Sequence, residues 1–170
     1  MLMLVIGGAG SGKSAFAESL VCSVGGQRIY LATMQAFDDE SLTRIARHRA
    51  LRADKGFVTV ERGLDLTGAE LPPGANVLLE DLSNLLANEC FSPAGGGTDA
   101  VRRGLERLIE RCENLTVVSN EVFLGGADYA VDTLEYMKEL AALNRELAAR
   151  ADLVAELVCG LPNVLKGELP

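Results

Sequence analysis

The chain has 170 residues and a net charge of −8, and 48% of its residues are hydrophobic. This length suits one domain with a sizeable buried core, and this composition is typical of a globular protein. The acidic charge argues against a nucleic-acid partner, because neutralising phosphates requires clustered Lys and Arg. We therefore expect a single domain over residues 1–170 that binds no nucleic acid.

The N-terminal apolar run, MLMLVI, is too short to cross a membrane or to form the core of a signal peptide. We expect a protein without a membrane span that is cytoplasmic. The four cysteines are widely spaced, and the chain has only one histidine that could join them as a metal ligand. They therefore match no zinc or redox motif. We expect reduced core thiols at these positions, which are Cys22, Cys90, Cys112 and Cys159.

Short apolar runs alternate with longer amphipathic segments along the chain. The apolar runs predict strands, and apolar residues at three- and four-residue spacing predict helices. The expected strands are 2–6, 28–33, 57–61, 76–80, 115–120 and 153–159. The expected helices are 13–24, 39–54, 82–91, 98–112 and 128–150. This alternation predicts an α/β fold of three layers, with a mostly parallel central sheet.

The turn after the first predicted strand carries the pattern G-x-x-x-x-G-K-[ST]. Its residues are Gly7, Gly8, Ala9, Gly10, Ser11, Gly12, Lys13 and Ser14. Glycines let backbone N–H groups point at phosphate oxygens, and the following helix adds the positive end of its dipole. We expect Lys13 to reach the β- and γ-phosphates and Ser14 to bind Mg²⁺. The pattern predicts a P-loop NTPase-like (RecA-like) fold and phosphoryl chemistry, but it names no substrate.

The predicted strand 76–80 ends in Glu80, and Asp81 follows it. An acidic residue in this place holds or orients Mg²⁺ in P-loop enzymes. We expect Glu80 to serve the metal with Ser14. Asp81 is the alternative, and either carboxylate could instead cap the next helix. The chain contains no Asn-Lys pair, which argues against a signalling GTPase.

The single histidine, His48, lies in the predicted helix 39–54. Arg44 and Arg52 lie four residues before and after it, so all three share one helix face. Arginines there would bind phosphate oxygens and keep the imidazole neutral, as a nucleophile that attacks an α-phosphate requires. The residues leave open the alternative of a surface or packing histidine without a catalytic role.

Six segments, taken in order, resemble one family: GGAGSGKS, YLATMQAFDDE, RIARHRALR, FVTVE, VLLE and SNEV. This is the bifunctional adenosylcobinamide kinase / adenosylcobinamide-phosphate guanylyltransferase family of cobalamin biosynthesis. The resemblance implies that adenosylcobinamide is phosphorylated with ATP or GTP. GMP is then transferred from GTP, through a guanylylated histidine, to the new phosphate. The histidine that matches is His48.

The resemblance also implies nucleotide contacts outside the P-loop. They map to Ala32, Thr33, Arg49, Arg52, Glu61 and Glu80. Glu61 and Arg52 have a simpler alternative explanation, as a strand-end charge and a helix-surface charge. The family tends to form trimers, so the resemblance implies a homo-oligomer.

The chain departs from the family pattern after Val122. It has FLGGADY where the family continues with a glycine, a Val-Pro pair and arginines, and Asp128 replaces the proline. We therefore do not carry over the family's corrinoid-facing surface, or any subunit contact that this segment forms, to this chain. Two alternatives to the bifunctional enzyme remain, a P-loop small-molecule kinase without guanylyltransferase activity and a nucleotide-binding regulatory module.

Overall fold

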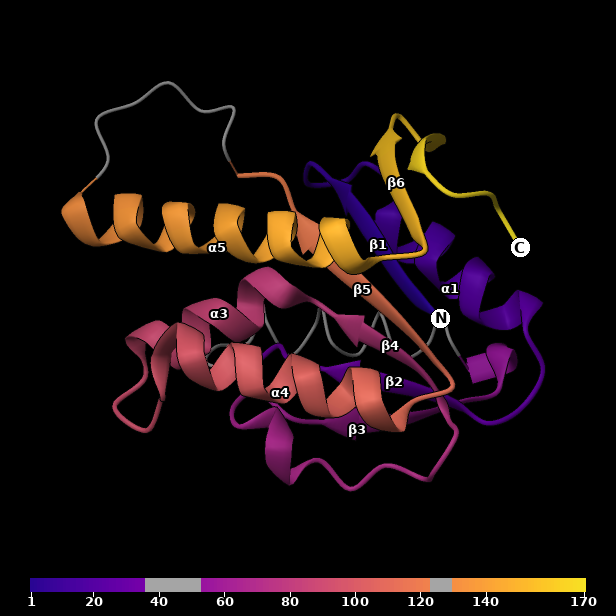
Figure 1. The fold of residues 1–170 in the computed structure, drawn as a ribbon, viewed down its shortest axis with the longest axis horizontal. Helices are drawn as coiled ribbons and strands as arrows, with labels where there is room; N and C mark the ends of the chain where they lie inside the picture. The colour runs from indigo at the N-terminus through magenta and orange to yellow at the C-terminus, as the bar shows by residue number, and fades with distance from the viewer. Residues whose placement is uncertain (36–52, 123–129) are drawn as a thin grey trace.

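The fold is built on one seven-stranded sheet, in the order β3-β2-β4-β5-β1-β6-β7 (Figure 1). The computed structural model describes residues 1–35, 53–122 and 130–170. The parallel strands are β1 (Leu2–Gly7), β2 (Arg28–Ala32), β3 (Phe57–Glu61), β4 (Asn76–Glu80), β5 (Asn114–Asn120) and β6 (Leu153–Val158). The last strand, β7 (Leu161–Lys166), pairs antiparallel with β6 at the edge.

Helices cover both faces of this sheet. They are α1 (Lys13–Ser23), α3 (Leu82–Phe91), α4 (Gly97–Arg111) and α5 (Val131–Arg150), with two short 3-10 helices, η1 (Ala53–Lys55) and η2 (Leu66–Gly68). Alternate residues of a strand face opposite sides. Met3 and Val5 therefore pack with α1, whereas Leu4 packs with α3, α4 and α5. Figure 1 shows these three helices together in front of the strands.

This arrangement confirms the predicted three-layer α/β fold with a mostly parallel sheet. One strand, β5, separates the P-loop strand β1 from the acidic strand β4, as in RecA-like folds. The predicted strands agree with β1 to β6 to within one residue at each end. The predicted helix 39–54 lies outside the described residues except for 53–54, which fall in η1.

The strand β7 was absent from the sequence prediction. Its sequence, LPNVLK, lacks the alternation of apolar and polar residues that a half-buried strand shows. All of its side chains are exposed, so neither face of the strand has to be apolar. It also contains Pro162, a residue that is confined to edge strands, first positions and bulges within sheets. Both features follow from its place at the edge.

The prediction that the cysteines are core thiols was wrong. Cys90 and Cys159 are exposed, and Cys22 and Cys112 are half-buried. Cys90 lies in the last turn of α3, and Cys159 lies in the turn between β6 and β7. Both residues lie in segments that border solvent. The wide spacing of the cysteines along the sequence therefore gave no information about their burial. All four are free thiols.

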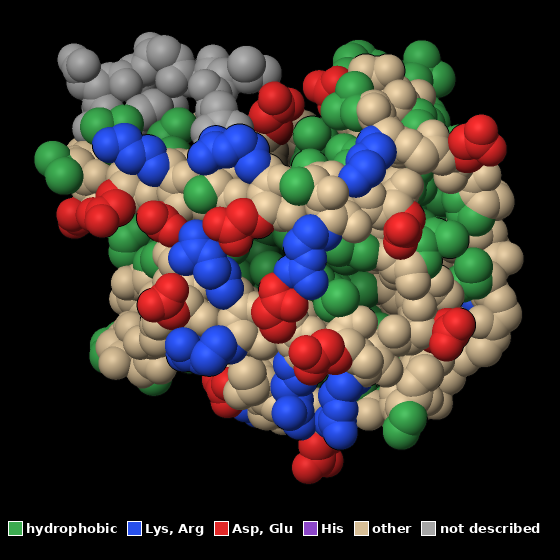
Figure 2. Space-filling model, viewed as in Figure 1, with side chains coloured by type: hydrophobic (Ala, Val, Ile, Leu, Met, Phe, Trp, Pro, Cys, Tyr) green, Lys and Arg blue, Asp and Glu red, His purple; other side chains and the backbone are tan. Residues whose placement is uncertain are grey.

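The surface over α4 and α5 mixes acidic and basic side chains (Figure 2). The side chain of Arg102, on α4, reaches toward α5, where it lies 3.1 Å from Glu146 and 3.6 Å from Glu139. Arg150 pairs with Glu106 across the same two helices. Arg102 and Arg150 thus tie α4 to α5 through ion pairs. No helix in the described part of the chain is long and apolar enough to cross a membrane.

The parallel strands bring the predicted site residues to one edge of the sheet. Ala32 is in register with Glu61 on one neighbouring strand and with Glu80 on the other. Gly7 is in register with Asn120 and with Leu157. In open α/β sheets, ligands bind outside this carboxyl edge. The register therefore collects residues from distant parts of the chain where a ligand is expected.

Truncating a core leucine should destabilise the protein far more than truncating one on β7. Leu79 is fully buried in β4, and Leu161 is 72% exposed. We expect Leu79→Ala to lower the free energy of unfolding by about 2–5 kcal/mol, and Leu161→Ala to change it by less than about 0.5 kcal/mol. Urea denaturation of both variants measures this. Equal losses would contradict the exposed position of β7.

Candidate active site

The P-loop joins β1 to α1 and depends on glycines for its path. Gly10 and Gly12 have φ angles of 72° and 92°, in the left-handed region that side chains disfavour. The carbonyl oxygen of Gly8 accepts hydrogen bonds from Ser11 N, at 3.2 Å, and from Lys13 Nζ, at 3.0 Å. No side chain caps the start of α1, so its first N–H groups face the loop. These donors and Lys13 form a cradle for phosphate oxygens.

The turn between β6 and β7 packs directly against this loop. Gly160 N donates to Ser11 O at 2.9 Å. A Cβ atom added at Gly12 would lie 3.2 Å from Gly160 Cα, and one added at Gly7 would lie 2.8 Å from Leu157 O. A side chain at Gly7 would force the backbone to shift, and one at Gly12 would press tightly on Gly160. The sequence motif did not reveal this contact, because it joins residues far apart in the chain.

A hydrogen bond connects the start of α1 to the end of β4. Ser14 Oγ donates to Glu80 Oε1 at 2.6 Å. The other carboxylate oxygen, Oε2, is buried and has no hydrogen-bond partner among the described residues. Burial raises the pKa of Glu80 to about 7, although the Ser14 hydrogen bond and the charge of Lys13 oppose this change. Glu80 therefore has one oxygen available to a cation or a water molecule.

Asp81 lies beside Glu80 but has a different role. It caps α3, where its Oδ1 accepts from Asn84 N at 2.7 Å and from Ser83 Oγ at 2.6 Å. Its Oδ2 accepts from the side-chain amides of Asn84 and Asn120, each at 3.1 Å. Four donors thus engage this carboxylate. The geometry favours Glu80 over Asp81 as a ligand, and it bears out the capping alternative for Asp81.

The other predicted nucleotide contacts are placed as follows. Ala32 is half-buried at the end of β2, and Glu61 is exposed at the end of β3. Thr33 is fully buried, and its hydroxyl bonds to the backbone of Glu80 and Asp81. His48, Arg49 and Arg52 lie outside the described residues. The structure therefore brings Lys13, Ser14 and Glu80 together, with Ala32 and Glu61 on the same edge.

The donor set fits magnesium better than a transition metal. Within the described ranges, no group of three or more His, Cys, Asp or Glu side chains could hold a metal ion. Mg²⁺ is commonly bound through one or two protein oxygens, with water and substrate phosphates completing its coordination. A serine hydroxyl and a carboxylate with a free oxygen, placed beside a phosphate cradle, meet that requirement.

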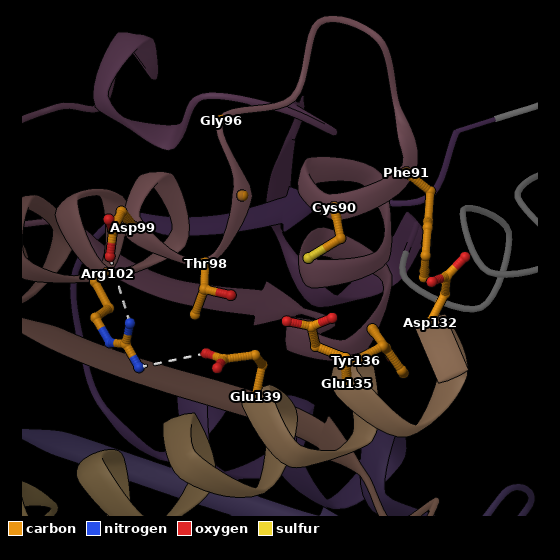
Figure 3. Close-up of a pocket in the computed structure, with 11 residues that line it drawn as sticks. Cys90, Phe91, Gly96, Thr98, Asp99, Arg102, Asp132, Glu135, Tyr136 and Glu139 are labelled. Carbon is orange, nitrogen blue, oxygen red and sulfur yellow. Dashed lines mark hydrogen bonds and ion pairs between the residues drawn. The ribbon is translucent and has the colours of Figure 1, made fainter. Parts of the chain in front are cut away.

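A separate pocket of about 590 Å³ lies between α3, α4 and α5 (Figure 3). Phe91 and Tyr136 line it, and acidic side chains such as Glu135 and Glu139 surround it. These helices cover the sheet face opposite to α1, whereas Ser14 and Lys13 belong to α1. None of the predicted site residues lines this pocket. The candidate active site is therefore the P-loop edge of the sheet and not this pocket.

The raised pKa of Glu80 predicts a pH-dependent stability for the ligand-free protein. A carboxyl whose folded-state pKa exceeds its unfolded value of 4.5 stabilises the fold below pH 4.5, and this contribution is lost as the pH rises through about 7. Between pH 5 and 8, wild type should lose roughly 2–3 kcal/mol of unfolding free energy more than Glu80→Gln, which cannot titrate there. Urea denaturation without Mg²⁺ and nucleotide measures both proteins, and identical pH slopes would contradict the raised pKa.

Comparison with known proteins shows the family of the chain. The sequence model of one family, described as cobinamide kinase / cobinamide phosphate guanyltransferase, matches residues 3–165. The bifunctional adenosylcobalamin biosynthesis protein CobP of Pseudomonas aeruginosa is 37% identical over 169 residues, which cover 97% of each chain. The CobU proteins of Escherichia coli and Salmonella typhimurium are 33% and 34% identical, over 95% of this chain and 97% of theirs.

Among solved structures, the P4 protein of bacteriophage phi6 in complex with ADP has a TM-score of 0.44 and 14% identity. The match covers 95% of this chain and 53% of that one. At this level of similarity, the strand order itself remains the basis for the fold. The matches in sequence extend over almost the whole chain, and the chain belongs to the cobinamide kinase / cobinamide phosphate guanyltransferase family.

Proposed function

We propose that this protein phosphorylates the hydroxyl of adenosylcobinamide with ATP or GTP and then attaches GMP to the new phosphate. The observation that carries the proposal is the Ser14–Glu80 hydrogen bond beside the Lys13 cradle, in a chain that belongs to this family. Enzymes that transfer phosphoryl groups must position the phosphates and stabilise their charge. A phosphate cradle, a cation and a carboxylate that binds the cation do this.

In the kinase step, the backbone N–H groups of Gly8–Ser14 and the start of α1 bind the phosphates. Lys13 is buried, with 7% of its surface exposed, so its charge acts on a phosphate with little screening by water. Its Nζ exchanges the bond to Gly8 O for the β- and γ-phosphates. Ser14 and Glu80 would hold Mg²⁺, which would neutralise charge on the phosphates when bound. Glu80 must be ionised to do so.

In the guanylyltransferase step, an imidazole nitrogen of His48 attacks the α-phosphorus of GTP. The new P–N bond forms while the P–O bond to pyrophosphate breaks, and pyrophosphate leaves. A phosphate oxygen of adenosylcobinamide phosphate then attacks the same phosphorus and releases the histidine. Arg49 and Arg52 contact the phosphates, and Ala32 and Glu61 contact the nucleotide. The assignments of His48, Arg49 and Arg52 rest on the sequence alone.

We also propose that the protein forms a homo-oligomer, with a trimer as the expected state. The exposed strand β7 supports it, because Leu161 and Leu165 are 72% and 56% exposed on an unpaired sheet edge. Edge strands of this kind offer unpaired backbone groups to another chain.

Removing the Lys13 charge should abolish phosphoryl transfer. We expect Lys13→Ala to lower the kinase turnover of cobinamide by about 10²-fold or more, because the transition state loses its main cationic partner. Lys138→Ala on the exposed surface of α5 serves as the matched control and should leave turnover unchanged. Near-normal turnover of Lys13→Ala would remove the P-loop from the mechanism.

His48→Asn should separate the two activities. Asparagine has similar polarity but cannot form the phosphoramidate, so the protein should retain no acid-labile label from α-labelled GTP after denaturation. Kinase turnover should survive in part, because it depends on the cradle. A wild type that retains no label would favour a kinase without guanylyltransferase activity. Absence of any turnover with cobinamide would favour a regulatory module.

A further inference from the structure

We infer that Thr33 is a positioning residue that sets the metal affinity of the site through the Glu80–Asp81 segment, and that its side chain does not touch the nucleotide. The inference rests on the proposed function, because it takes Glu80 as the carboxylate that serves Mg²⁺. It assigns Thr33 a role different from the direct nucleotide contact that the family resemblance implies.

Every polar group of Thr33 already has a partner inside the protein. Its N–H donates to Glu80 O at 3.0 Å, and its carbonyl oxygen accepts from Asn88 Nδ2 at 2.8 Å. Its Oγ1 accepts from Asp81 N at 2.8 Å and shares its single proton between the carbonyl oxygens of Glu80, at 3.0 Å, and Asp81, at 2.9 Å. The residue is 0% exposed. A direct contact with nucleotide would require one of these buried bonds to break.

The same segment is held from its other side by β5. Asn120 ends that strand, and its side-chain amide donates to Asp81 Oδ2 at 3.1 Å and to Ser83 Oγ at 2.6 Å. Because β4 lies between β2 and β5, Thr33 and Asn120 hold Asp81 from its two neighbouring strands. The segment is thus fixed on both sides at the point where β4 passes into α3.

This fixation matters because Glu80 is the residue next to the held peptide. Its carboxylate reaches Ser14 Oγ at 2.6 Å and leaves Oε2 buried without a partner among the described residues. A metal ligand is effective only when neighbouring groups orient it, and losing such a partner typically lowers metal affinity by 10- to 100-fold. Thr33 and Asn120 are those partners, acting through the backbone and through Asp81.

The test compares Thr33→Val with a matched control, Thr116→Val. Both residues are threonines with 0% exposure, but the Thr116 hydroxyl has no hydrogen-bond partner among the described residues. Mn²⁺ binding in the presence of a non-hydrolysable GTP analogue is followed by electron paramagnetic resonance. We expect Thr33→Val to weaken Mn²⁺ binding about tenfold or more, and Thr116→Val to leave it unchanged. Thr33→Ser, which keeps the hydroxyl, should restore it.

A second readout separates positioning from nucleotide contact. Tripolyphosphate and GTP binding without metal should be the same for Thr33→Val and wild type, since the cradle is untouched. Weaker GTP binding without metal would show a direct contact and overturn the inference, as would unchanged Mn²⁺ binding. If Thr33→Val does not fold, Asn120→Ala tests the same segment, and normal Mn²⁺ affinity in that variant also overturns it. Wild-type turnover of cobinamide tests the proposed function separately.

Discussion

The hydrogen bond between Ser14 and Glu80 is the interaction on which the arrangement of the site depends. It joins residues 66 positions apart, at the start of α1 and the end of β4. The two elements meet because β5 alone separates β1 from β4, and because α1 packs on the face toward which Glu80 points. Glu80 is buried there, and burial raises its pKa, whereas the hydrogen bond from Ser14 opposes the rise. The hydrogen bond thus fixes the position of this carboxylate, and burial decides the direction of its pKa shift.

Neighbouring backbone helps to hold the phosphate cradle in shape, in addition to the bond from the Lys13 side chain to Gly8 O. The β6–β7 turn bonds to the middle of the loop through Gly160 and Ser11, and Gly12 passes close to the same turn. Because β7 follows this turn, the exposed last strand helps to fix the loop although it buries little apolar surface itself.

The strands, the helices and the P-loop were predictable because each leaves a local pattern. Buried strands show apolar runs, helices show three- and four-residue spacing, and the phosphate cradle needs glycines at fixed offsets. The exposed strand β7 left no such pattern, and the cysteines gave no sign of their exposure. From the sequence we expected Glu80 to serve the metal, but Asp81 remained an alternative, since both are carboxylates at the end of one strand.

The sequence by itself determined the fold class, the phosphate cradle and the family, because these depend on residue types at short and regular spacing. Only the tertiary structure decided which carboxylate is free. Asp81 accepts four hydrogen bonds, one of them from Asn120 on another strand, whereas Glu80 keeps an oxygen without a partner in the described part of the chain. The family resemblance in the sequence likewise implies that Thr33 contacts the nucleotide. In the structure its side chain is buried and bonded to the Glu80–Asp81 peptide, which favours the positioning role inferred above. Hydrogen bonds between distant segments are decided by strand order and register, and these become visible only when the sheet has formed.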